Sequence, residues 1–324
     1  MLYIESGYNL LRAGGYIFVV QKGVYFMKRN SDKPVSPPKR ILAAIVCLIA
    51  LLMLYYSQNK TLDITEYQYK SEQIPEGFDK FCIVQISDLH YASFGTDNKR
   101  LIDEISSCDP DIIVITGDIV DKQFTNIPRS VSFVAQACKI APVYYVTGNH
   151  ETELSDEDCA ELMNGLENAG AAILEDEVIE LERLGDHISL IGLKDESLQG
   201  GMLHMLTDGM DPSQFSLLLA HEPQFLDLYS ESPVDLVLSG HEHGGLIRLP
   251  FIGGLISHQG FPPKYIEGMH KNGDTTMIIS RGIGNSSLLL RVNCQPEIVC
   301  IELQKASPAE LPDGEHQSLS KIKE

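Results

Sequence analysis

The sequence has no tryptophan and lacks the motifs of several large enzyme classes. It contains neither a G-x-x-x-x-G-K-[ST] loop nor a G-x-S-x-G turn, so a P-loop nucleotide motor and a serine hydrolase are not indicated. Its seven cysteines are scattered and include no C-x-x-C pair. A disulfide framework and a zinc ribbon are therefore not indicated either.

Positive charge is scarce outside the N-terminal region. The 324 residues carry 25 Lys or Arg against 45 Asp or Glu, which gives a net charge of −20. Residues 1–60 hold eight of the cations against only Glu5 and Asp32, so the remaining 264 residues carry −26. A surface this acidic repels a phosphate backbone, and we expect no nucleic-acid partner and no nuclease activity on DNA. A small phosphate ester stays compatible if bound metal supplies the local positive charge.

One long apolar run, Ile41–Tyr56, contains sixteen residues without a charge and follows five Lys or Arg between Lys28 and Arg40. It is slightly shorter than the roughly 20 residues of a typical spanning helix and slightly longer than a secretory h-region of about 7–15 residues. No A-x-A cleavage site follows it. We interpret it as an uncleaved transmembrane helix or signal anchor. The positive-inside rule then predicts a single-pass protein of the cell membrane, with its N-terminus in the cytoplasm and the folded domain outside.

The expected organisation has five parts. They are a cytoplasmic N-terminal segment at 1–40, the anchor at 41–56, a polar tether at 57–79, a folded domain at 80–303 and a polar tail at 304–324. Met27 begins a better n-region than Met1, so we interpret residues 1–26 as an upstream extension.

Apolar runs and helical patterns alternate from Phe81 onward. Five runs end at residues 87, 116, 147, 220 and 239, and helical patterns lie near 98–107, 128–139 and 156–169. Further strands are expected at 187–193, 276–280, 287–292 and 297–303. This alternation predicts an α/β fold with buried sheets.

Polar residues with metal-ligand chemistry follow directly after five of these strands. They are Asp88, His90, Asp118, Asn149, His150, His221, His241 and His243. Because sites in α/β sheets form beyond the carboxyl ends of the strands, we expect these side chains to gather at one rim. Imidazole and carboxylate without thiolate suit zinc, manganese or iron. Taken singly, each residue is equally typical of a turn or a helix cap, and only the ordered set indicates a site.

The five motifs, in this order over Phe81–Leu303, resemble the calcineurin-like metallophosphoesterase family. The final motif, Gly240-His241-Glu242-His243-Gly244-Gly245, is similar to the GHTHGGQ of membrane-linked bacterial phosphohydrolases in that family. The resemblance implies a metallo-dependent phosphatase-like fold, which is a four-layer α/β/β/α sandwich. It also implies hydrolysis of phosphoric esters at a pair of divalent metal ions, either manganese, zinc or iron.

The resemblance also implies a role for each residue of the set. One metal would be bound by Asp88, His90, Asp118 and His243, and the other by Asp118, Asn149, His221 and His241. Asp118 would bridge, a hydroxide between the metals would be the nucleophile, and His150 would act near the leaving group. The two ions, the two aspartates and the hydroxide together leave about one positive charge, which favours a phosphodiester and still admits a monoester.

Two residues depart from the family's final motif, with Glu242 in place of Thr and Leu246 in place of Gln. They leave the substrate open, either a small phosphate ester or a lipid head group, so an enzyme directed at membrane lipids or glycolipids is the alternative. An inactive metal-binding scaffold is a remote alternative, because all eight motif residues are present. Asp121 is expected to support the site without contacting metal.

Overall fold

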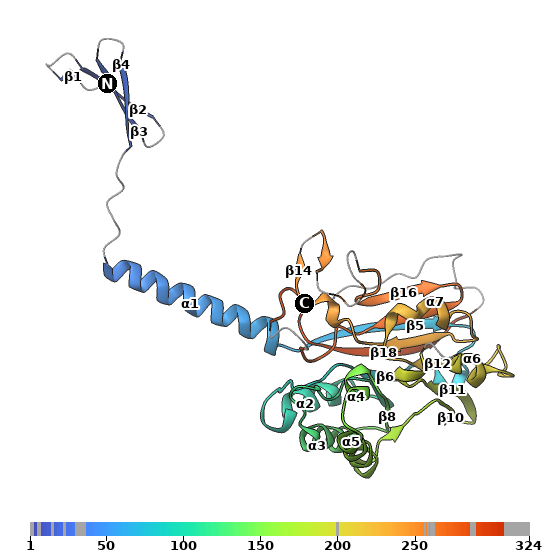
Figure 1. Cartoon of the computed structure of the whole chain (residues 1–324). Helices are drawn as coiled ribbons and strands as arrows, with labels where there is room; N and C mark the ends of the chain where they lie inside the picture. The colour runs from blue at the N-terminus through green and yellow to red at the C-terminus, as the bar shows by residue number, and fades with distance from the viewer. Residues whose placement is uncertain are drawn as a thin grey trace. The chain divides into compact units, whose positions relative to one another are not determined.

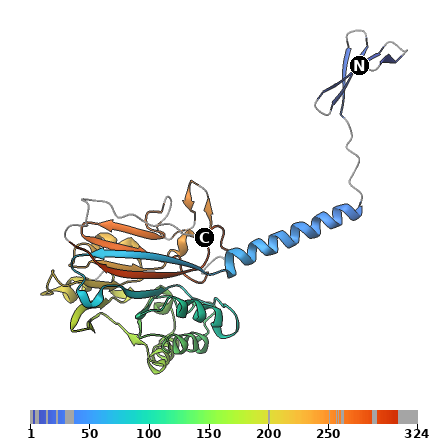
Figure 2. The same ribbon diagram turned by 180° about the vertical axis from the view of Figure 1, so that it is seen from behind.

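The computed structural model describes residues 3–4, 8–13, 16–21, 24–29, 37–198, 201–249, 251–255, 257, 259, 263–285 and 290–307. The chain forms two compact units, Met1–Met53 and Leu54–Glu324. Figures 1 and 2 show them from two opposite sides.

The first unit contains a small antiparallel sheet and most of a long helix. The sheet has the order β1 (Tyr3–Ile4), β2 (Tyr8–Ala13), β3 (Tyr16–Gln21) and β4 (Val24–Arg29). Helix α1 (Pro37–Lys60) begins in this unit and ends in the second one. Its segment Ile41–Lys60 is long and apolar enough to cross a membrane, with a mean hydropathy of 2.2 and none of its apolar window buried.

The second unit is built on two six-stranded sheets. The first has the order β5 (Asp63–Ser71), β18 (Glu297–Lys305), β6 (Phe81–Ile86), β7 (Ile112–Thr116), β8 (Val143–Val146) and β9 (Ala172–Ile173). The second has the order β10 (Glu177–Arg183), β11 (Asp186–Gly192), β12 (Ser216–Leu219), β13 (Leu236–Ser239), β17 (Thr275–Ile279) and β16 (Gly268–Asn272). The central strands β6–β9 run parallel, as do β11, β12, β13 and β17.

Helices cover the outer face of each sheet. The first sheet carries α2 (Lys99–Ser107), α3 (Ile127–Ala137) and α5 (Asp156–Ala169), and the second carries α6 (Met202–Thr207) and α7 (Leu226–Tyr229). Two shorter features, α4 (Asn149–Thr152) and the hairpin of β14 (Arg248–Leu249) with β15 (Gly253–Gly254), lie in the loops. Local signals set the ends of α5, because the Ser155 hydroxyl accepts the Asp158 amide and Gly170 ends the helix at a φ of 103°.

Three buried apolar clusters separate the layers. One lies between the two sheets and includes Ile83, Val114, Leu217 and Leu238. The other two lie between each sheet and its own helices. The four-layer α/β/β/α sandwich predicted from the sequence is therefore confirmed (Figure 1).

The polar tether predicted over 57–79 has to be corrected. Helix α1 continues to Lys60, and Asp63–Ser71 forms β5, which pairs in parallel with β18 along its whole length. Ile74 and Phe78 are fully buried beyond that strand. The segment looked like a linker because β5 is an edge strand whose alternate side chains face solvent, so few large apolar residues are needed to hold it.

The other predicted elements have mixed outcomes. The five ligand-bearing strands and the three helical patterns are confirmed to within two residues. In the expected strand at 287–292, residues 287–289 lie outside the described residues, and Val292 forms a single bridge with Ile247. The structure describes residues 304–307 of the predicted polar tail, and strand β18 includes two of them, Gln304 and Lys305. Residues 308–324 of the tail are also outside the described part.

Candidate metal centre

The five strands deliver their polar residues to one rim that is shared by both sheets. Asp88 and His90 follow β6, Asp118 follows β7, and the helix α4 begins with Asn149 directly after β8. His221 follows β12 of the second sheet, and His241 and His243 follow β13. The backbone amide of His241 donates to the Asp88 carboxylate at 3.0 Å, which ties the two sheets together at the site.

One group of ligand atoms gathers around Asp88, His90 and His243. The two imidazole Nε2 atoms lie 3.2 Å apart, and the Nε2 atom of His243 lies 3.6 Å from Asp88 Oδ1. All three side chains are buried. Their ligand atoms are close enough together to bind one cation.

A second group gathers around Asn149, His221 and His241. Asn149 Oδ1 lies 3.2 Å from His221 Nε2 and 2.9 Å from His241 Nδ1, and these two nitrogens are 3.2 Å apart. An amide oxygen and two imidazole nitrogens at such distances form a compact mixed nitrogen and oxygen donor set.

Asp118 lies between the two groups. Its Oδ2 atom is 3.7 Å from His90 Nε2 and 3.3 Å from His221 Nε2. Its Oδ1 atom accepts the backbone amide of His150 at 2.9 Å, which holds the carboxylate in place. A single carboxylate oxygen therefore lies next to a histidine of each group.

Backbone carbonyls orient three of the ligand histidines. Three Nδ1 atoms face carbonyl oxygens, which are those of Val120 for His90 (3.1 Å), Thr116 for His221 (2.8 Å) and Gly284 for His243 (3.3 Å). An Nδ1–H that donates to a carbonyl leaves the Nε2 lone pair facing the site, which is the arrangement typical of metal-binding histidines.

His150 has the opposite arrangement. Its Nδ1 atom accepts the backbone amide of Lys122 at 3.3 Å, so the neutral ring carries its proton on Nε2. Its side chain is 14% exposed, whereas those of His90 and His221 are fully buried. His150 is close enough to His90 and Asp118 to belong to a metal-binding group by distance alone. Its partial exposure and the Lys122 amide on its Nδ1 atom distinguish it from the buried ligand histidines.

Burial controls the protonation of the site. It raises the pKa of the Asp88 carboxyl to about 7 and lowers the pKa of His90 to about 4. Burial opposes charge on Asp118 and His221 too, but each stabilises the other's charged form. The pKa of Asp118 therefore falls below its ordinary value, and the pKa of His221 rises above 6.5. Buried carboxylates and imidazoles that compensate one another in this way form an environment suited to cations.

The local backbone is strained where the ligands lie. Non-glycine residues with positive φ include Asp88 (53°), His90 (47°), Asp118 (53°), His241 (72°) and His243 (50°). Such conformations concentrate at functional sites. A Cβ atom on Gly148 would lie 2.4 Å from Asp118 Oδ1, and one on Gly240 would lie 1.8 Å from Ser87 Oγ. Glycine is required at both positions because the site is packed against their backbone.

Sequence reasoning did not assign a role to two buried residues beside the site. Glu151 accepts the backbone amides of Gly148 (2.7 Å), Asp118 (2.8 Å) and Val120 (3.2 Å), so it ties together the loops that follow β7 and β8. The guanidinium of Arg291 is fully buried and donates to the same Gly284 carbonyl that orients His243. In the sequence, a role for Glu151 near the site is indicated by its position next to His150. No sequence pattern indicates a role for Arg291.

The structure shows contacts of the two residues whose roles the sequence left open. Asp121 Oδ1 accepts the amides of Gln123 and Phe124 and so closes a turn, and its Oδ2 atom lies 3.9 Å from both His90 Nδ1 and His150 Nδ1. Glu242 is buried and accepts the side-chain amide of Gln259 at 3.1 Å.

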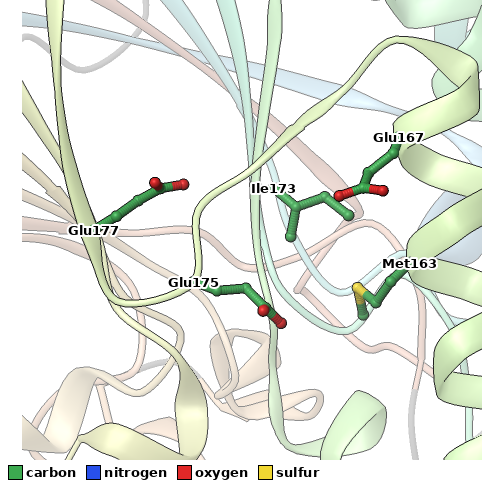
Figure 3. A pocket seen from close by; sticks show the side chains of 5 residues that line it. All are labelled: Met163, Glu167, Ile173, Glu175 and Glu177. Carbon is green, nitrogen blue, oxygen red and sulfur yellow. The ribbon is translucent and has the colours of Figure 1, made fainter.

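The site is distinct from the surface pocket shown in Figure 3. That pocket is lined by Met163, Glu167, Ile173, Glu175 and Glu177. Three carboxylates without a cation among the lining side chains would repel a phosphate group. None of the eight candidate residues lines it.

Comparison with known proteins identifies the family. Residues 82–245 match the calcineurin-like phosphoesterase family. The uncharacterized metallophosphoesterase YkuE of Bacillus subtilis is 34% identical over 270 residues, which are 78% of this chain and 89% of that protein. The phosphodiesterase YaeI of Escherichia coli is 28% identical over 69% of this chain and 82% of its own length. A transmembrane protein with a metallophosphoesterase domain from Danio rerio is 26% identical over 82% of this chain and 63% of that protein.

Solved structures show weaker similarity. A dimetal phosphatase from Danio rerio aligns with a TM-score of 0.43 and 13% identity, covering 63% of this chain and 88% of that chain. The assignment therefore rests on the sequence comparisons, and the apolar helix together with the transmembrane relative indicates membrane association. The chain belongs to the calcineurin-like phosphoesterase family and is a metal-dependent hydrolase of phosphate esters.

Proposed function

We propose that the chain hydrolyses phosphodiesters at a two-metal centre that is held by the seven predicted ligands. The observation that carries this proposal is the position of Asp118 Oδ2, within 3.7 Å of one ligand nitrogen in each group. When bound, two divalent ions would supply a water-derived nucleophile near neutral pH and would neutralise charge on the phosphate. The residues of the chain would hold these ions and the ester and would stabilise the leaving oxygen.

Stabilisation of the leaving oxygen is the role we assign to His150. Its Nδ1 atom accepts the Lys122 amide, so Nε2–H is the group available to donate to a substrate oxygen. Asp121 Oδ2 lies 3.9 Å from the same Nδ1 atom. His150 would thus donate a hydrogen bond from Nε2–H to the departing oxygen and stabilise the charge that develops there.

The preference for diesters follows from carboxylates near the second ligand group. Burial, followed by the charge of Asp195, raises the pKa of Glu222 to about 7, and the charge of Glu242 adds to this shift. Burial raises the pKa of Asp195 to about 6. With these pKa values Asp195 is mostly charged and Glu222 about half charged near neutral pH, and their negative charge disfavours the second charge of a phosphomonoester more than the single charge of a diester.

A comparison of two aryl esters tests the preference. The metal-loaded full chain in detergent should show a higher kcat/KM for an aryl phosphodiester than for the matching monoester. Glu242→Gln should narrow the ratio by improving turnover of the monoester, and Glu231→Gln, at an exposed position, should leave it unchanged. A native preference for the monoester, or an unchanged ratio in Glu242→Gln, would show that these carboxylates do not select the substrate.

The same assay can separate small esters from lipid head groups. A lipid substrate is favoured by the end of α1, since Asn59 in its last turn accepts the backbone amide of Arg291 at 2.8 Å, and Arg291 lies against the His243 loop. If lipids are the substrate, a phospholipid dispersed in mixed micelles should be turned over faster than its water-soluble glycerophosphodiester counterpart. Equal rates would favour a small soluble ester.

We also propose that the second unit, Leu54–Glu324, which we call the catalytic unit, lies outside the cell membrane. Five cations precede the apolar segment between Lys28 and Arg40, and only Lys60 follows it closely. Protease added to intact or wall-stripped cells should therefore digest Phe81–Leu303. Full protection until the membrane is lysed would place the unit in the cytoplasm.

A further inference from the structure

Exposed apolar side chains are concentrated on one hairpin of the catalytic unit. Phe251 is fully exposed at 109% of its reference area, Ile252 is 59% exposed, Leu249 is 42% exposed and Leu255 is 36% exposed. All four lie in or next to the hairpin of β14 and β15, which stands out from the body of the unit in both views (Figures 1 and 2). Large apolar residues clustered on a projecting tip usually mark an interaction surface.

The hairpin is attached rigidly to the metal-binding loop. It begins three residues after Gly245, and a Cβ atom on Gly245 would lie 2.6 Å from the Cα atom of Gly254. The amide of Leu255 donates to the Ile247 carbonyl at 2.9 Å, and the amide of Arg248 donates to the Val292 carbonyl at 2.9 Å. Whatever binds the tip is therefore held at a fixed position relative to His243.

The base of the hairpin is linked to the last turns of α1 through one residue, Asn293. Asn293 joins them, because its backbone amide donates to Gln58 Oε1 at 2.6 Å while its side-chain amide donates to the Arg248 carbonyl at 3.2 Å. Gln58 lies two residues after Tyr56, the last residue of the predicted anchor. At a rise of about 1.5 Å per residue, Gln58 is only about 3 Å further along the helix. Tyr55 and Tyr56 are the residue type that concentrates at membrane–water interfaces.

Positive charge is present next to the same helix end, although the chain as a whole is acidic. Lys60 Nζ donates to the Ser93 carbonyl at 3.2 Å, and Arg100 donates to the Tyr56 hydroxyl at 3.4 Å. The Arg129 guanidinium donates to the Tyr91 carbonyl at 3.2 Å. Lys60 and Arg129 thus contact the segment that directly follows His90, and Arg100 contacts the end of the predicted anchor. Cations near a membrane surface attract anionic head groups.

We propose that the apolar tip, defined as Leu249, Phe251, Ile252 and Leu255, inserts into the lipid bilayer that α1 enters. The tip supplies apolar side chains that would lie among the acyl chains, and Lys60, Arg100 and Arg129 face the head groups. The inserted tip would be a second attachment to the membrane, in addition to α1. With two attachments, the rim that carries the metal ligands is held at the membrane surface, whereas with α1 alone the catalytic unit could rotate. The docking does not depend on which ester the site hydrolyses.

The absence of tryptophan from the chain allows a direct test, because one introduced tryptophan reports a single position. Full-length Phe251→Trp and Ile252→Trp would be reconstituted into vesicles of phosphatidylethanolamine and phosphatidylglycerol, with or without bromine on the acyl chains. Met205→Trp is the matched control, since Met205 is a 71% exposed apolar residue on α6 of the same unit. Bromine quenches only tryptophan that lies among the acyl chains.

We expect the emission of Phe251→Trp and Ile252→Trp to shift to shorter wavelength and to lose intensity in brominated vesicles. Met205→Trp should do neither. Intensity at both tip positions that is unaffected by bromine would overturn the proposal. A shift to shorter wavelength without quenching would also overturn it, because the tip would then be covered by protein, such as a second copy of the chain.

Discussion

Glu151 offers the sharpest test of how the loops of the metal site are held. The side chain is 1% exposed, and its two oxygens accept three backbone amides, those of Gly148, Asp118 and Val120. Glu151→Ala leaves all three donors without their acceptor in a buried place. Each buried donor left unsatisfied costs about 1–3 kcal/mol, so the expected loss in the free energy of unfolding is about 3–9 kcal/mol, and water entry favours the lower end.

Glu151→Gln is the milder variant and guards against outright unfolding. Its one carbonyl oxygen can replace Oε2 and keep the amides of Gly148 and Asp118, so only the bond to Val120 is lost. The expected cost is then about 1–3 kcal/mol. Glu153→Ala is the control, since Glu153 is partly exposed, pairs only with Lys122 at the surface and should contribute about 0–1 kcal/mol.

Urea unfolding of the detergent-solubilised full chain, followed by far-UV circular dichroism, measures these effects. The urea midpoints should decrease in the order wild type, Glu153→Ala, Glu151→Gln and Glu151→Ala, with the first two close together. Elemental analysis should show less bound metal in Glu151→Ala, because the loop that carries Asp118 is released. An Ala variant that unfolds at the wild-type urea concentration would refute the role given to Glu151.

The pKa of Glu151 leads us to expect that the free energy of unfolding of the metal-free chain depends on pH. Burial, followed by the charge of Asp118, raises the pKa of Glu151 from 4.5 to about 8. The folded state therefore holds a proton that the unfolded state has lost between about pH 4.5 and 8, and stability falls as the pH rises through that range. Asp88, with its pKa raised to about 7, acts in the same direction. Glu151→Gln should reduce this slope without abolishing it, and an unchanged slope would contradict the assignment.

Two further predictions concern the chemistry of the site. His150→Ala should keep near-normal metal content and lower kcat by about 10²–10³-fold, the usual loss for one hydrogen-bond donor that stabilises charge in the transition state; metal loss or full activity would contradict the role given to His150. Asp118→Asn should lower the metal stoichiometry more than Asn149→Ala, because only Asp118 Oδ2 lies next to both ligand groups. Equal loss of metal in the two variants would contradict a bridging role.

The sequence predicted best what depends on continuous apolar runs and their ends. Strands β6, β7 and β8 are buried over most of their residues, so their sequences are apolar and their carboxyl ends are easy to place. Once those ends are known, the polar residues after them are expected at one rim, and the order of the five motifs selects the eight candidates among them.

Features that depend on contacts between distant segments could not be predicted in this way. Strand β5 is held by its pairing with β18, more than 200 residues later, and its own polar sequence is typical of a linker. The buried Arg291 lies in a run that favoured a strand, and its bonds to backbone carbonyls become visible only in three dimensions. The positive φ angles of the ligands have no sequence signal either, because Asp and His tolerate them without requiring them.

The contacts of Asn59 change how the membrane helix should be regarded. Its side-chain oxygen accepts the Arg291 amide at 2.8 Å, and the guanidinium of Arg291 donates to the Gly284 carbonyl, which also accepts the Nδ1–H of His243. The last turn of α1 is therefore linked by hydrogen bonds to the residues that orient His243, a candidate metal ligand. A soluble fragment that begins at Thr61 would lose this turn and leave the Arg291 amide without its partner. One that begins at Leu54 keeps the turn, so the boundary of the catalytic unit lies within the helix and not after it.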